Sequence, residues 1–192
     1  MKKFLSVISV CFAVCCSLFF TSCSYNSFVE LREEVVNQWA NVETQYQRRY
    51  DLVPNLVATV KGVAKHEEEV FSNIAEARSK LGTSVNIDDA ESFKAYQKAQ
   101  NELGSSLSRL LVITENYPEL KSNANFLDLQ SQLEGVENRI STARTRYNDS
   151  VKKYNTAISR FPGVITAKMF HFEQKEYFKA DEASAKAPVV SF

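Results

Sequence analysis

Apolar residues are most regularly spaced in residues 124–160, which read ANFLDLQSQLEGVENRISTARTRYNDSVKKYNTAISR. They recur at intervals of three and four residues, at Phe126, Leu129, Leu133, Val136, Ile140, Ala143, Tyr147, Val151, Tyr154 and Ile158. This spacing places them on one face of an α-helix, and Pro162-Gly163 is expected to end that helix. Residues 124–160 therefore predict a long amphipathic helix whose apolar face must be covered by other helices.

The same spacing recurs upstream and predicts three further helices, at 28–49, 52–81 and 88–116. With five Gly and four Pro among 192 residues, the chain has too few turn residues for an all-β fold or for a phosphate-binding loop in each half of an α/β fold. Short connections between helices favour antiparallel neighbours. The sequence therefore predicts an all-α protein, built as an antiparallel up-down four-helix bundle.

Pro54 makes the junction between the first two predicted helices ambiguous. A proline inside a helix costs about 3 kcal/mol but is tolerated in a first turn, where Asp51 can act as the cap. We therefore predict a break near residues 50–52, and a single kinked helix over residues 28–81 is the alternative. The break predicts that the 50–54 turn and the 117–123 loop meet at the end of the bundle farthest from the N-terminus.

The first 23 residues have the layout of an export signal. Two lysines precede an apolar run over residues 4–20, small residues follow, and all four cysteines of the chain lie in this stretch. The small residues before Cys23 resemble a bacterial lipobox, so Cys23 is the candidate lipid-attachment site. About 17 apolar residues also permit an uncleaved membrane-spanning anchor, and simple secretion is a third alternative.

This layout divides the chain into three parts. Residues 1–23 form a signal peptide or membrane anchor, residues 24–172 form the helical bundle, and residues 173–192, which are small, polar and aperiodic near their end, form a flexible tail. We expect a membrane-anchored protein of the cell envelope with its bundle outside the cytoplasm.

The chain offers little for catalysis or metal binding. His66 and His171 lie far apart, and neither belongs to a Glu-x-x-His or His-Glu-x-x-His sequence. No nucleophile elbow and no phosphate-binding glycine loop is present in the sequence. Because 23 basic residues balance 23 acidic ones, the charge does not favour nucleic acid. We therefore expect no catalytic residue, no cofactor, no metal site and no nucleic-acid partner.

The polar cluster most suited to binding a partner consists of Arg48, Arg49, Asp51 and Asn55. Two fixed cations beside a helix cap can bind a carboxylate or an anionic head group. The alternative is a structural turn, in which Asp51 and Asn55 satisfy backbone donors and the arginines pair with a neighbouring helix.

A Tyr-Asn pair occurs twice, at 147–148 and 154–155. A polar layer that fixes the register of the helices explains this repeat, and a ligand pocket is the alternative. Trp39, the single tryptophan, is most simply a core residue.

Several of these residues lie in longer stretches that resemble the bacterial LemA family. The stretches are QWANV at 38–42, RRYDLVPNLV at 48–57, VKGVAKHE at 60–67, ENYPELK at 115–121, and the two Tyr-Asn pairs. The resemblance extends from Tyr25 to Phe172. It implies a small membrane-tethered antiparallel helical bundle outside the cytoplasm, in a family for which no general biochemical activity is established. The Arg-Arg and Asp-Leu-x-Pro-Asn-Leu elements carry over as a structural signature.

We therefore expect a non-enzymatic, envelope-anchored bundle that presents its distal end or one helical face to a protein partner. One alternative is a binder of a small anionic or lipid ligand, which requires a cavity beside Trp39, Tyr147 and Tyr154. Another is an accessory factor of a membrane protease or transporter. The sequence leaves open the oligomeric state and the membrane that holds the anchor.

Overall fold

The computed structural model describes residues 2–64, 66–81 and 85–179, and it describes side chains from residue 24 onward. The backbone of residues 2–23 is helical, but the expected signal or anchor segment and Cys23 lie outside the residues whose side chains are described. Among the described residues, no helix is both long enough and apolar enough to cross a membrane.

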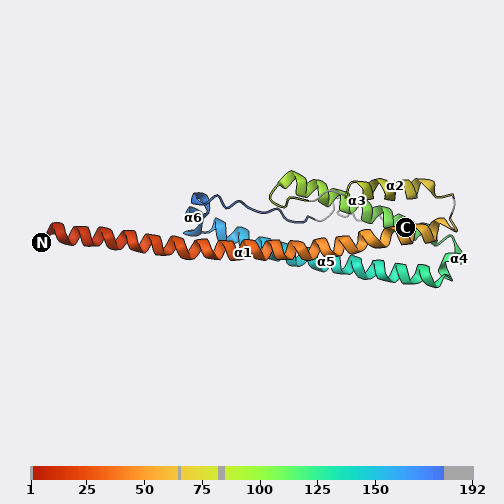
Figure 1. The fold of residues 1–192 in the computed structure, drawn as a ribbon, viewed down its shortest axis with the longest axis horizontal. Coiled ribbons are helices and arrows are strands. Elements are labelled where there is room, and N and C mark those ends of the chain that lie inside the picture. Colours follow the sequence, from red (N-terminus) through yellow and green to blue (C-terminus); the bar gives the residue numbers. More distant parts are fainter. Residues whose placement is uncertain (1, 65, 82–84, 180–192) are drawn as a thin grey trace, which may run out of the picture.

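The described chain folds into six helices and contains no strand, which confirms the all-α prediction. They are α1 (Lys2–Lys61), α2 (Glu68–Ser79), α3 (Ala90–Thr114), α4 (Pro118–Lys121), α5 (Ala124–Ser159) and α6 (Gly163–Met169). The long helices α1 and α5 lie side by side, and α2 and α3 cover the distal part of this pair (Figure 1). The described residues form six helices of very different lengths, so the four-helix antiparallel bundle that we expected is not confirmed.

α1 passes through Pro54 without a break, so the predicted break at residues 50–52 is wrong. Val53 and Leu56 are each only 2% exposed, whereas Pro54 faces solvent. Burying a Val or Leu side chain contributes about 1.5–3 kcal/mol, which offsets the missing hydrogen bond to the Tyr50 carbonyl. α1 ends at Lys61, so a single helix over 28–81 is wrong as well.

The described residues between α1 and α2, 62–64 and 66–67, take the place that we assigned to the 50–54 turn. They meet the 117–123 loop at the distal end, where the Tyr117 hydroxyl donates a hydrogen bond to Glu67 Oε1 at 3.1 Å. α5 then begins after Asn123, whose side-chain oxygen accepts hydrogen bonds from two backbone N–H groups of the first turn. This cap explains why α5 starts at the predicted residue.

The core forms two clusters along the α1–α5 pair. The proximal cluster, nearer the N-terminus, contains Phe28, Val35, Trp39, Val42 and Tyr46 of α1, together with Phe93, Phe178 and the α5 residues from Val136 to Ile158 that face α1. The distal cluster joins Val53, Leu56 and Val60 of α1 to apolar residues of α2, α3, α4 and the start of α5. One continuous apolar stripe of α1 therefore serves both clusters.

After α6, a non-helical C-terminal segment runs back along the bundle towards its distal end (Figure 1). Residues 173–179 belong to this segment, although we expected them to be part of a flexible tail. Phe178 is only 7% exposed and lies in the proximal cluster. The rest of the expected tail, residues 180–192, lies outside the described residues.

Candidate interaction site

Arg48 and Arg49 are adjacent in sequence but lie on different faces of α1, because successive helical residues point about 100° apart. Arg49 is only 2% exposed, whereas Arg48 is exposed. The structure therefore separates the four predicted binding residues: Arg49 enters the interior, and Arg48 stays on the surface with Asp51 and Asn55.

Arg49 links α1 to α3 and α5. Its Nη1 donates to the two carboxylate oxygens of Glu137, at 3.0 and 3.3 Å. Its Nη2 donates to the backbone oxygen of Gln100 at 3.0 Å and to Gln100 Oε1. These contacts agree with the structural alternative, in which an arginine pairs with neighbouring helices. We therefore keep only Arg48, Asp51 and Asn55 as candidates for binding a partner.

A second arginine, Arg144 of α5, lies beside the Arg49 contacts. Its Nε donates to the Tyr46 hydroxyl at 2.7 Å, and its Nη2 donates to Asn101 Oδ1 at 3.1 Å. Burial raises the pKa of Tyr46, and the charge of Arg144 lowers it only in part. Tyr46 therefore remains a neutral phenol that accepts the hydrogen bond from Arg144 and holds this half-buried side chain against α1.

Arg48, Asp51 and Asn55 line an open groove of about 590 Å³ between α1 and α5, which we call the outer groove. Arg139 of α5 lines the same groove. Asp51 accepts a hydrogen bond from Gln47 at 2.8 Å, but neither arginine has an ion-pair or hydrogen-bond partner in the described part of the chain. Two unpaired guanidinium groups in one groove are suited to bind carboxylates.

The sequence pointed to three of these groove residues but not to Arg139. Arg139 lies in the regular part of α5, where an exposed arginine is ordinary. Its relation to Arg48 depends on how α1 and α5 are paired, and helical spacing within one segment carries no information about that pairing.

The repeated Tyr-Asn pairs of α5 hold the C-terminal segment. Asn148 donates to the carbonyl oxygen of Phe178 and accepts from its N–H, both at 2.9 Å. Asn155 makes the same two contacts with Lys175, also at 2.9 Å. The Tyr147 hydroxyl donates to the carbonyl oxygen of Glu176 at 3.3 Å. Side-chain amides thus supply the hydrogen bonds that a neighbouring β-strand would otherwise give this segment.

The Phe178 side chain occupies the place where the alternative of a ligand binder requires a cavity. Its ring stacks on Trp39, with centroids 5.9 Å and planes 18° apart, and lies 5.2 Å from the Tyr147 ring and 5.0 Å from the Phe93 ring. Burial and, to a smaller extent, the Asp88 carboxylate raise the pKa of Tyr147. The rings around Trp39 therefore pack against one another as part of the core.

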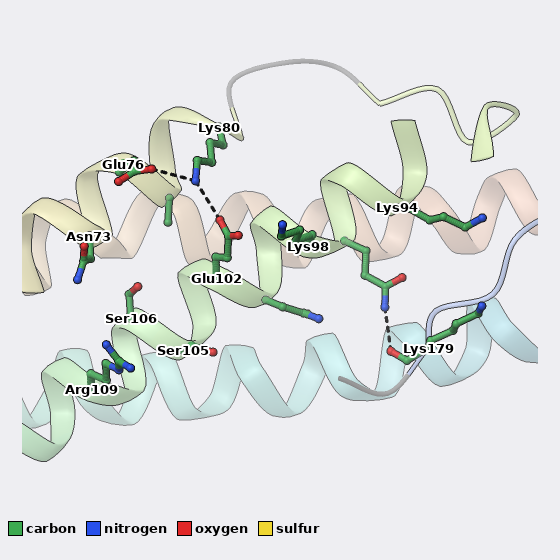
Figure 2. Close-up of a pocket in the computed structure, with 13 residues that line it drawn as sticks. Asn73, Glu76, Lys80, Lys94, Lys98, Glu102, Ser105, Ser106, Arg109 and Lys179 are labelled. Atoms are coloured by element: carbon green, nitrogen blue, oxygen red, sulfur yellow. Dashed lines mark hydrogen bonds and ion pairs between the residues drawn. The ribbon is translucent and has the colours of Figure 1, made fainter. Parts of the chain in front are cut away.

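Another groove, of about 690 Å³, lies between α2 and α3 and next to Lys179 (Figure 2). Lys80 bridges Glu76 at 3.0 Å and Glu102 at 3.2 Å across it, and these contacts raise the pKa of Lys80. The pairs are exposed, so they contribute little to stability. The groove is built from surface charges of three separate segments, and no single stretch of sequence predicted it.

The two histidines do not belong to any of these grooves, and both are exposed. Among the residues that the structure describes, no three His, Cys, Asp or Glu side chains gather in an arrangement that could hold a metal ion. The geometry of the described grooves is suited to binding through charge and shape.

Comparisons with known proteins extend the resemblance found in the sequence. The model of the LemA family matches residues 38–192 of this chain. Magnetosome protein MamQ of Magnetospirillum gryphiswaldense is 27% identical over 187 residues, which cover 87% of this chain and 68% of that protein. Protein LemA of Metamycoplasma hominis is 24% identical over 157 residues, which cover 82% of this chain and 69% of that protein. The family match includes the candidate residues of the outer groove.

Proposed function

Since this chain belongs to the LemA family, we propose that it is a non-enzymatic protein of the cell envelope, tethered to a membrane through residues 1–23, which binds a protein partner in the outer groove. The unpaired arginines of that groove carry the proposal. Arg48 and Arg139 come from antiparallel helices and line one open surface with Asp51 and Asn55. A partner that presents acidic side chains matches this surface.

The shape of α1 supports the tether. α1 is helical from Lys2 to Lys61, and its N-terminal part projects beyond the other helices (Figure 1). An apolar segment at the end of a projecting helix can anchor the bundle without taking part in its core. Cys23 is the proposed lipid-attachment residue, so Cys23→Ser should abolish acyl labelling and release the protein from membranes. Unchanged membrane retention would favour an uncleaved spanning anchor.

Photo-cross-linking from the groove in intact cells tests partner binding. Asn55→p-benzoylphenylalanine in the full chain should give one dominant protein adduct, which mass spectrometry can identify. Adding Arg48→Ala and Arg139→Ala should remove the adduct without lowering the melting temperature. Arg146→Ala, an exposed arginine of α5 outside the groove, is the matched control and should leave the adduct intact. An adduct that survives the double substitution would refute the role of the groove.

A further inference from the structure

Exposed apolar side chains are concentrated at the proximal end of the bundle. Nine large apolar residues are exposed among those whose side chains are described, and five of them lie on or beside α6: Tyr25, Phe161, Ile165, Met169 and Phe170. The other four lie on α1, α3, α5 and the C-terminal segment. Such a concentration marks an interaction surface rather than the ordinary scatter of single apolar residues.

The two faces of α6 explain why these side chains are exposed. The buried residues of α6 are small: Gly163, Thr166 and Ala167. Gly163 lies so close to Phe28 of α1 that an added Cβ would be 2.8 Å from its ring. The close approach turns the large side chains away from the core, so Ile165 is 53% and Met169 is 58% exposed. α6 therefore presents its apolar face outward.

Tyr25, Phe161, Ile165, Met169 and Phe170 form one surface, which we call the α6 patch. It extends from α6 onto α1. The Phe170 ring contacts the Tyr25 ring at a centroid distance of 4.8 Å, and the patch is flanked by the exposed cations Arg160 and Lys168. Figure 1 places α6 at the end of the bundle from which the N-terminal part of α1 projects. The apolar run over residues 4–20 ends five residues before Tyr25, which is about 8 Å along a helix.

We infer that the α6 patch is a lipid-contact surface, which rests on the membrane beside the anchor and sets the orientation of the bundle. This inference relies on the proposed tether. Aromatic and apolar side chains this close to the end of a membrane anchor enter the interfacial region of the bilayer. Cations beside them reach the phosphate head groups. The patch adds a second point of attachment, so the bundle is held at a fixed angle instead of pivoting about residue 24.

Photo-cross-linking to lipid tests the inference. The full chain is reconstituted in vesicles of phosphatidylethanolamine and phosphatidylglycerol, with p-benzoylphenylalanine in place of Ile165. Illumination should give lipid adducts. The matched control carries the same substitution at Val112, which is 65% exposed but lies on α3, and should give none. Adding Met169→Glu and Phe170→Glu to the Ile165 variant should remove the lipid adducts while the melting temperature stays unchanged.

Three results would overturn the inference, and they separate it from the tether. Protein that floats with the vesicles but gives no lipid adduct at position 165 refutes the patch and leaves the tether standing. An adduct between two copies of the chain at position 165 shows that a second protein molecule covers the patch. Protein that stays in solution refutes both the tether and the patch.

Discussion

One side-chain amide, that of Asn148, satisfies both backbone polar groups of Phe178, through two hydrogen bonds of 2.9 Å. The pair places the Phe178 ring against Trp39, the single tryptophan of the chain. A helix near the end of the sequence thus fixes a non-helical segment that carries a core side chain. Asn148 therefore contributes to the packing of the proximal cluster by fixing the position of Phe178.

Asn148→Ala should release the C-terminal segment around Phe178. Removing the amide leaves two backbone groups unpaired, which should lower the free energy of unfolding by about 1–3 kcal/mol. Trp39 emission should shift to the red as water reaches the indole. Urea unfolding followed by fluorescence measures both effects. Asn138→Ala, at an exposed position of the same helix, is the control, and an equal loss in both variants would contradict the prediction.

Arg49→Ala and Arg48→Ala should differ in stability although the residues are neighbours. Arg49→Ala leaves the Gln100 carbonyl without its guanidinium donor and Glu137 without its charge partner. Because the Glu137 side chain is 42% exposed, the ion pair contributes little to stability. We expect the free energy of unfolding to fall by about 2 kcal/mol, mainly through the lost hydrogen bonds. Arg48→Ala should change stability by less than about 0.5 kcal/mol. Thermal unfolding of both variants measures the difference.

Pro54→Ala should stabilise the protein. Alanine restores the N–H that can donate to the Tyr50 carbonyl and removes the clash of the ring, although the unfolded chain gains freedom. The net gain should be about 1–2 kcal/mol in urea unfolding. Asn55→Ala controls for helix propensity alone, which is worth less than about 0.7 kcal/mol. A loss of stability in Pro54→Ala would mean that α1 needs a bend at this position.

Alkaline pH should destabilise the fold through its buried phenols. Burial raises the pKa of Tyr147, Tyr46 and Tyr154 in the folded state, whereas tyrosines of the unfolded chain ionise near pH 10. The contribution of these neutral phenols to the free energy of unfolding is therefore complete below about pH 10. It is lost as the pH rises through the pKa values of the folded state. Tyr147→Phe removes one of these titrations. Its unfolding free energy should fall less steeply above pH 10 than that of the unchanged protein.

Helical spacing was sufficient to predict α3 and α5, because each has apolar residues at intervals of three and four and a clear break after it. It failed at Pro54, where the local cost of proline is known from the sequence but the burial of Val53 and Leu56 depends on α5 and α3. A break was therefore predicted inside a helix that tertiary packing keeps intact.

The candidate site shows the same division between local and tertiary information. The spacing of α1 already distinguishes Arg49, which follows Tyr46 and precedes Val53 on the apolar stripe, from Arg48 on another face. The role of Asn148 could not be found in this way, because its partner Phe178 lies in a segment without periodicity.

In the proposed arrangement, the unbroken helix α1 sets the distance between the membrane and the outer groove. From Tyr25 to Asn55 the helix advances thirty residues, or about 45 Å at 1.5 Å per residue. With Tyr25 at head-group level and α1 upright, a protein whose loops barely emerge from the bilayer cannot touch Arg48. A partner that binds in the outer groove would then have to extend as far from the bilayer, or belong to a facing layer of the envelope.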